Sequence, residues 1–237
     1  MNKNEFRLDG RLSLCAEYVR SGAKVADIGT DHAYLPVYLV KSGIAKSAIA
    51  ADINPGPLKS GTDTINRFGL SDKIQTRLSN GLEKIFPSEC DDIVIAGMGG
   101  ELICSIINKA AWLKCNAKRL ILQPMTRPEI LRSFLYANGF EILAERAVAC
   151  DRRLYTVMSV CYCGEARNLN EFSAITGKLQ PDLNKPDKEF LERALSSLKK
   201  KQSGLALGKN EKEAAALTNT INKLLDYIAG GSNDENQ

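Results

Sequence analysis

The sequence has a single histidine, His32, among 237 residues, and it has no Cys-x-x-Cys pair. With so few ligands of the usual type, neither a structural zinc site nor another bound metal is expected. The seven cysteines form an odd count, and we interpret them as reduced, mostly buried thiols rather than disulfides. No run of 18 or more apolar residues occurs, which argues against a membrane-spanning helix.

The first residues, "MNKNEFRLDGRL", lack the apolar segment of a signal peptide, so the cytoplasm is the expected location. A net charge of +4 permits an anionic partner without requiring one. The length allows one sizeable core plus an additional element. The sequence does not determine the oligomeric state, and a monomer is favoured.

Short β-rich runs alternate with helical patterns over the first two thirds of the chain. Four of the first five strands are nearly continuous apolar runs, which is typical of strands covered by helices on both faces. The pattern therefore indicates a doubly wound α/β sheet. The predicted strands are 24–29, 47–52, 73–78, 92–97, 119–124, 141–150 and 154–163, and the predicted helices between them are 34–43, 55–68, 100–110 and 127–138.

Only "DRR" separates the last two strands, which predicts an antiparallel hairpin. A Rossmann-like sheet of seven strands, the last one antiparallel, is the arrangement of the class I methyltransferases. An NAD-binding domain would more often continue with a sixth parallel strand.

The composition becomes more polar after Gly164. Two amphipathic helices follow, with apolar residues three and four positions apart, and "SGLALGKN" between them is interpreted as a turn. This pattern predicts an antiparallel helical hairpin appended to the sheet. The expected organisation is a methyltransferase domain over 1–164 that includes an N-terminal helix, the hairpin over 165–230, and a disordered tail over 231–237.

The turn after the first strand, "DIGTDHAYLP", points to a nucleoside ligand. Gly29 would let a ligand approach the backbone N–H groups at the start of a helix. Asp52 ends the second strand, where an acid can bind a ribose diol. The alternative is a capped turn with a surface acid.

The replaced glycines in this turn discriminate between two nucleoside cofactors. The second and third glycines of the dinucleotide fingerprint are absent, and Asp31 stands where a pyrophosphate would be repelled. The same carboxylate would favour the sulfonium and ammonium groups of S-adenosylmethionine. The turn therefore favours the methyl donor over NAD.

Further ligand contacts are expected at other strand ends. Asn80 and Gly81 follow the third strand and could meet the adenine ring, although an ordinary turn is the alternative. "AGMGG" over 96–100 puts three glycines at the end of a buried strand. Glycines lower the stability of a strand, so their presence here indicates that a ligand approaches the backbone closely.

The motifs "ADIGTDHAYLP", "AGMGGELI" and "LILQP", in this order and spacing, resemble those of the bacterial tRNA (adenine-22-N1)-methyltransferases. The resemblance covers nearly the whole chain. It implies a cytosolic enzyme that moves a methyl group from S-adenosylmethionine to N1 of an adenine in the tRNA D-arm. It also implies that the C-terminal coiled-coil-like domain helps to hold tRNA.

Matched to the motifs of this family, nine residues are expected to bind the cofactor. One departure is that Met125 and Thr126 follow the "QP" of the fifth strand, where the family often has Asn. The family resemblance therefore does not carry over polar contacts from this loop to the target base. The nine cofactor residues are Asp27, Gly29, Asp31, Asp52, Asn80, Gly81, Gly97, Met98 and Gly99.

The expected chemistry needs little from the protein beyond positioning and charge. Adenine N1 has an in-plane lone pair and attacks without prior deprotonation, and its methylation makes the ring cationic. A nearby carboxylate would stabilise that charge. Asp31 is the catalytic candidate, and His32 could relay a proton. Alternatively, Asp31 only contacts the ammonium group of the donor, and His32 is a cap or packing residue.

Adenine N1 lies on the Watson–Crick edge, so the base must leave its stem, which requires a second RNA-binding element. Residues 178–223 carry ten Lys and Arg against six Asp and Glu, most densely at Lys199, Lys200 and Lys201. A solvated helix face is the alternative interpretation. Weaker candidates for a basic track are Arg7, Arg11, Arg127 and Arg132.

Two other functions stay open at this point. One is a class I methyltransferase that acts on another RNA position or on a small molecule, although the basic hairpin argues against a small molecule. The other is a non-catalytic protein that binds S-adenosylmethionine or RNA, although the intact Gly29, Asp52 and "AGMGG" argue against it.

Overall fold

The computed structural model describes residues 7–207 and 211–230, and the predicted tail over 231–237 lies outside them. No helix in this part of the chain is long and apolar enough to cross a membrane. In chain order, the elements are α1 Gly10–Tyr18, β1 Ala23–Ile28, α2 Tyr34–Lys41, β2 Ala45–Asp52, α3 Pro55–Arg67, β3 Ile74–Leu78, η1 Pro87–Glu89, β4 Asp92–Gly99, α4 Gly100–Asn108, η2 Ala111–Leu113, β5 Arg119–Thr126, α5 Pro128–Ala137, β6 Phe140–Cys150, β7 Arg153–Tyr162, α6 Glu171–Thr176, α7 Lys185–Leu207 and α8 Glu211–Ile228.

The seven predicted strands form one sheet in the order β3-β2-β1-β4-β5-β7-β6. The pairs among the first five strands are parallel, and β7 is antiparallel to both β5 and β6. The two-residue turn of the last hairpin, Asp151 and Arg152, has positive φ at both positions, which matches the twist of the flanking strands. The predicted fold is therefore confirmed, including the antiparallel final strand.

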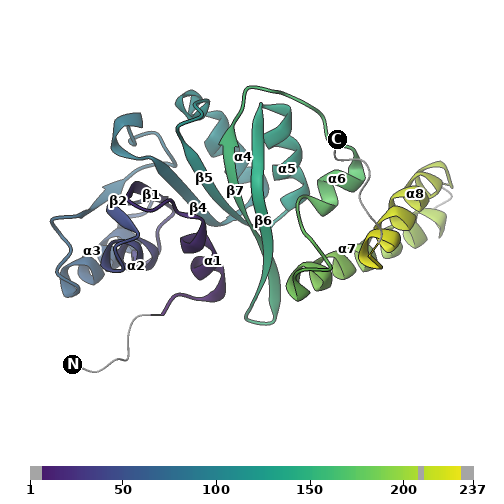
Figure 1. Ribbon diagram of the computed structural model, residues 1–237, viewed down its shortest axis with the longest axis horizontal. Coiled ribbons are helices and arrows are strands. Elements are labelled where there is room, and N and C mark those ends of the chain that lie inside the picture. Colours follow the sequence, from purple (N-terminus) through teal and green to yellow (C-terminus); the bar gives the residue numbers. More distant parts are fainter. Residues whose placement is uncertain (1–6, 208–210, 231–237) are drawn as a thin grey trace.

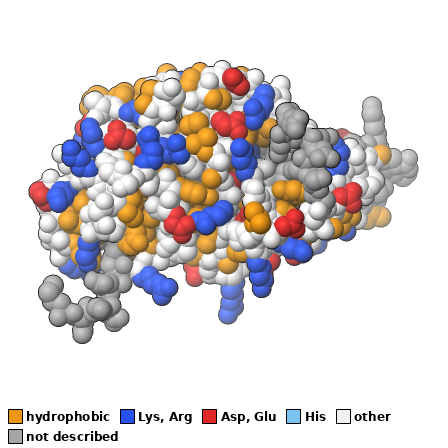
Figure 2. All heavy atoms as spheres, viewed as in Figure 1, with side chains coloured by type: hydrophobic (Ala, Val, Ile, Leu, Met, Phe, Trp, Pro, Cys, Tyr) orange, Lys and Arg blue, Asp and Glu red, His pale blue; other side chains and the backbone are white. Residues whose placement is uncertain are grey.

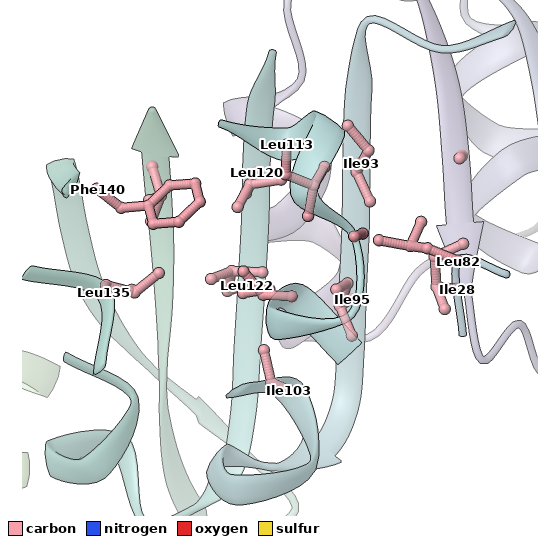
Figure 3. Packing of buried hydrophobic residues seen from close by; sticks show 14 of the residues in the cluster. Ile28, Leu82, Ile93, Ile95, Ile103, Leu113, Leu120, Leu122, Leu135 and Phe140 are labelled. Atoms are coloured by element: carbon pink, nitrogen blue, oxygen red, sulfur yellow. The ribbon is translucent and has the colours of Figure 1, made fainter. Parts of the chain in front are cut away.

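Each face of the sheet packs on its own set of helices (Figure 1). Successive side chains along a strand point to opposite faces, so Leu120 and Leu122 pack on one side of β5 and Ile121 on the other. Figure 3 shows the first of these clusters, in which side chains of β4 and β5 meet α4 and α5. Its labelled members include Ile93, Ile95, Ile103, Leu120, Leu122, Leu135 and Phe140.

A third apolar cluster joins α7 and α8 to each other and to β6 through Ala147. Gln202, near the end of α7, donates to the carbonyl of Ala214 at 3.3 Å and to Thr218 at 2.8 Å, both in the first half of α8, in agreement with the expected antiparallel pair. They extend beyond β6 at one end of the molecule (Figure 1). The predicted turn over 203–210 is wrong for 203–207, which continue α7, and 208–210 lie outside the described residues.

A buried polar network fastens α6, the short helix that precedes this pair, to α5 and the sheet. Arg132 in α5 and Glu145 in β6 are both fully buried and pair at 2.8 Å. Arg132 also donates to the carbonyls of Ala174 and Ile175 at 2.7 and 2.8 Å. The suggestion that Arg132 extends a basic surface track is therefore wrong, because its charge is used inside the protein.

Candidate functional site

The turn after β1 passes directly across the end of β2. The backbone N–H groups of Gly29 and Thr30 both donate to the carbonyl of Ala51, at 2.8 and 2.9 Å. Gly29 has a φ of 78°, a conformation that residues with a Cβ rarely adopt. A Cβ at this position would also overlap the methyl group of Met98. The backbone conformation therefore favours glycine here, whereas the Met98 methyl group, at the end of a flexible side chain, would have to move to admit a Cβ.

Two carboxyl groups lie at the ends of the adjacent strands β1 and β2. Asp27 is buried, and burial raises the pKa of its carboxyl to about 6; the Thr30 side chain offsets part of this rise, and the nearby Asp52 carboxylate adds to it. Among the described residues, no Lys, Arg or His forms an ion pair with Asp27. Asp52 accepts from the backbone N–H of Asn54 through Oδ1 at 2.7 Å, which orients its carboxylate at the strand end.

This donor set fits S-adenosylmethionine. A buried carboxyl without a cationic partner can receive the positive charge of the methyl donor. The second oxygen of the Asp52 carboxylate can accept from a ribose hydroxyl. At Gly29 the turn carries no side chain that would block the approach of a ligand to the backbone.

Asp31 and His32 lie on the solvent side of the same turn. Their side chains are 79% and 45% exposed, and His32 Nε2 lies 3.4 Å from Asp31 Oδ1. His32 and Ala33 both have positive φ, which directs the chain sharply into α2. The His32 ring stacks on that of Tyr34, with the ring centres 5.2 Å apart and the planes 16° from parallel. These polar groups are therefore accessible to a large substrate.

The loops after β4 and β5 lie against each other beside this turn. β4 pairs with β5 up to Gly99 opposite Thr126. A Cβ at Gly100 would overlap the carbonyl oxygen of Arg127, and one at Gly99 would meet Thr126 Oγ1 at 3.3 Å. The glycines of "AGMGG" are thus explained partly by close packing within the protein, and the prediction that a ligand also approaches Gly97, Met98 and Gly99 stays a prediction.

Asn80 and Gly81 follow β3, on the far side of β2 from β1. The Asn80 side chain is exposed and donates to Glu83 Oε1 at 2.7 Å. Gly81 has a φ of 57°, and a Cβ there would lie 3.2 Å from Ile106. Their assignment to the adenine ring stays a prediction, because the turn also has a sufficient structural explanation.

Five of the seven basic candidates are exposed. Arg7 precedes α1, Arg127 is the N-cap residue of α5 and has a left-handed backbone conformation, and Lys199–Lys201 lie on α7. On the face shown in Figure 2, Lys and Arg side chains are interspersed with acidic and apolar ones. A groove of about 490 Å³ connects the start of α5 with α7, and sequence reasoning missed it. Its lining includes Pro128, Glu129, Leu154, Phe190, Arg193 and Lys201.

Arg11, like Arg132, is engaged mostly inside the protein. Its guanidinium pairs with Asp9 at 2.7 Å and lies over the ring of Tyr155, 5.4 Å from the ring centre. It also donates to Gln123 Oε1 at 3.3 Å. Only 21% of the side chain is exposed, so most of its hydrogen-bonding capacity is used by α1 and β5.

The sheet order brings most of the cofactor candidates together. Since β2, β1, β4 and β5 are neighbours, their carboxyl ends place Asp52, Gly29, Met98 and Arg127 along one edge. Lys199–Lys201 lie instead on the helical pair beyond β6 (Figure 1). The Lys199–Lys201 cluster is thus separate from the cofactor candidates, and the groove runs from the start of α5, next to Arg127, to Lys201 on α7.

Comparison with known proteins agrees with this arrangement. Residues 8–158 match the family described as "Methyltransferase domain". The tRNA (adenine(22)-N(1))-methyltransferase of Bacillus subtilis is 41% identical over 155 residues, which cover 65% of this chain and 65%, just under two thirds, of that enzyme.

Solved structures extend the similarity to the whole chain. The crystal structure of the B. subtilis m1A22 tRNA methyltransferase TrmK superposes with a TM-score of 0.82 at 31% identity, covering 94% of this chain and 100% of that one. A Streptococcus pneumoniae protein, a candidate tRNA (m1A22) methyltransferase bound to S-adenosyl-L-methionine, gives 0.78 at 32% identity, covering 92% and 98%. The sheet order, the glycine turn after β1 and these similarities together show that the chain belongs to the bacterial tRNA (adenine-22-N1)-methyltransferase family.

Proposed function

We propose that this protein transfers a methyl group from S-adenosylmethionine to N1 of adenine 22 in the D-arm of tRNA. The observation that carries the proposal is the turn after β1, where a cofactor surface and two exposed polar groups share one short segment. Gly29 and the buried Asp27 lie on its inner side, and Asp31 and His32 lie on its outer side. The identity of the substrate, adenine 22 of tRNA, is inferred from the family to which the chain belongs.

The residues at the ends of β1, β2 and β4 would hold the cofactor. When bound, S-adenosylmethionine supplies an electrophilic methyl group on a sulfonium. Asp52 would accept from the ribose hydroxyls, and Asp27 would balance the positive charge from its buried position. Gly29 keeps the turn free of side-chain atoms, and Met98 closes the space above it.

Asp31 and His32 would act on the target adenine. N1 attacks with its own lone pair, so the chain does not need a base to begin the reaction. The ring becomes cationic as the bond forms, and the Asp31 carboxylate would stabilise that charge. His32, 3.4 Å from Asp31, would receive the proton that the methylated ring later releases.

The exposed basic residues would hold the tRNA while adenine 22 is extruded. Lys199–Lys201 supply phosphate contacts at the end of the molecule remote from the cofactor, and Arg127 and Arg7 supply contacts closer to it. The groove between α5 and α7 gives the RNA a path between the two regions. We propose that the enzyme works in the cytoplasm, as a monomer.

The test is to incubate the protein with S-adenosylmethionine and unmodified tRNA and to identify the modified nucleosides by mass. The proposal expects 1-methyladenosine. A different methylated nucleoside would favour action on another RNA position. Binding of both ligands without any methylated product would favour the non-catalytic alternative.

A further inference from the structure

Strand β4 loses its regular pairing with β5 at Gly97. Ala96 pairs with Gln123 and Met98 pairs with Pro124, so Gly97 is one additional residue in β4. Its φ of 78° lies in the left-handed region, as in a bulge built on glycine. The bulge takes the Gly97 N–H out of the ladder, and this group needs an acceptor from elsewhere.

The side chain of Gln123 supplies that acceptor. Its Oε1 accepts from the Gly97 N–H at 3.0 Å, and its Nε2 donates to the carbonyl of Pro124 at 2.9 Å. Gln123 is fully buried, so neither bond is replaced by water if the side chain is lost. The amide therefore links the ends of two neighbouring strands at the loop "AGMGG".

Arg11 fixes the orientation of this amide from the other side. Its Nη1 donates to Gln123 Oε1 at 3.3 Å, while its Nη2 is held by Asp9 Oδ2 at 2.7 Å. A guanidinium has donors only, so the oxygen of the amide must face it. Asp9 also caps α1, accepting from the Leu12 N–H at 2.9 Å, and α1 is thereby tied to the loop after β4.

The loop that Gln123 holds touches the cofactor turn directly. Met98, the residue after Gly97, places its methyl group against Gly29. A shift of this bulge would therefore move Met98 relative to the turn. We infer that Gln123 is a positioning residue for the S-adenosylmethionine site, and that Arg11 acts through Gln123 rather than on tRNA. The inference rests on the proposed function in taking the cofactor to bind over Gly29.

The first arm of the test is Gln123→Leu, which keeps a branched side chain of comparable size and removes both the acceptor and the donor of the amide. Its matched control is Gln75→Leu, the same change on an exposed position of the edge strand β3. Calorimetric titration with S-adenosylmethionine, without tRNA, should give a Kd roughly tenfold or more above wild type for Gln123→Leu and no change for Gln75→Leu. The melting temperature is measured alongside. A folded Gln123→Leu protein with a Kd within twofold of wild type would overturn the inference.

The second arm is Arg11→Met, which also covers the case in which Gln123→Leu does not fold. The inference expects weaker S-adenosylmethionine binding, with an unchanged Kd for tRNA and an unchanged salt dependence of that Kd. A phosphate contact from Arg11 would give the reverse result, with weaker tRNA binding and a shallower salt dependence. Because the cofactor titration contains no RNA, a failure to methylate tRNA would contradict the proposed function without altering this result.

Discussion

The methyl group of Met98 occupies the space that a side chain on Gly29 would need. The two residues come from the ends of adjacent parallel strands, β4 and β1, and their contact closes one side of the cofactor turn. Substitutions at either residue are therefore expected to change the Kd for the cofactor more than they change the stability of the fold.

Gly29→Ala should raise the Kd for S-adenosylmethionine about tenfold or more. The change adds left-handed strain of about 1–2 kcal/mol and pushes Met98 out of its place. Gly22→Ala is a matched control, because Gly22 has a φ of 77° and no atoms within 4 Å of an added Cβ. Titration of both variants should show a defect in the first alone. In the Gly29→Ala background, Met98→Ala should recover part of the binding, and a double variant no better than the single one would contradict the contact.

Asp27 should make cofactor binding dependent on pH. The pKa of its carboxyl is about 6, and the positively charged donor favours the ionised form. Affinity should therefore rise as the pH increases through about 6, with proton release on binding. Calorimetry between pH 5 and 8, in buffers of different ionisation enthalpy, measures both effects. Asp27→Asn should remove the pH dependence, and an unchanged profile would show that another group titrates.

The Asp27 carboxyl should also lower the free energy of unfolding of the unliganded protein as the pH rises from about 4 to 6. The pKa is raised in the folded state, from 3.8 to about 6, so the folded protein binds this proton more tightly than the unfolded chain. Ionising Asp27 then costs stability as the pH rises from about 4 to 6, by about 1–3 kcal/mol. Denaturant unfolding should show Asp27→Asn gaining stability relative to wild type over that range. A constant difference between the two proteins would contradict this assignment.

Asp31→Asn should reduce the rate of methyl transfer about 100-fold or more while leaving tRNA affinity unchanged. Its side chain is exposed and its only described ion pair is with His32, so the fold should tolerate the change. Single-turnover kinetics with saturating cofactor separates the chemical step from cofactor binding. Asp72→Asn, an exposed acid just before β3, is the control. A wild-type single-turnover rate would remove Asp31 from the chemistry.

Replacement of Lys199–Lys201 with Ala should weaken tRNA binding and make it less sensitive to salt. Each lost phosphate contact lowers the slope of log K against log salt by about 0.7 to 0.9. Cofactor affinity should stay unchanged, since α7 lies beyond β6 (Figure 1), and β4, β5 and β7 separate β6 from β1, which Gly29 follows. Lys46 and Lys73, exposed at the opposite edge of the sheet, provide the control. An equal effect from the control pair would indicate that only net charge matters.

Strand patterns allowed most of the fold to be predicted. Short β-rich runs, of which four of the first five are nearly continuous apolar stretches, predicted all seven strands. The "DRR" hairpin predicted the direction of the last strand, because such a short connection permits no crossover. The six-residue α6 was missed, because one and a half turns are too short to show helical periodicity. The chain continues as helix through Ser203 and Gly204, where composition suggested a turn, with the neighbouring Gln202 bonded to Thr218 on α8.

The candidate site was predictable where a residue's backbone position decides its role. Gly29 and Asp52 stand at strand ends, and parallel strands bring their carboxyl ends to one edge. The arginines were harder, because their roles depend on partners distant in the sequence. Arg132 is neutralised by Glu145 on the next strand, and Arg11 reaches Gln123 across 112 positions of the chain. Neither partner could be identified from spacing alone.

The most direct test of the central claim is to map the methyl group on tRNA. A purified tRNA with adenine at position 22 is incubated with the protein and S-adenosylmethionine, in parallel with the same tRNA carrying guanine there. We expect one methyl group per molecule, recovered as 1-methyladenosine at position 22 by fragment mass analysis, and none in the guanine variant. Methylation that persists in the guanine variant, or no 1-methyladenosine in any tRNA with adenine 22, would contradict this claim.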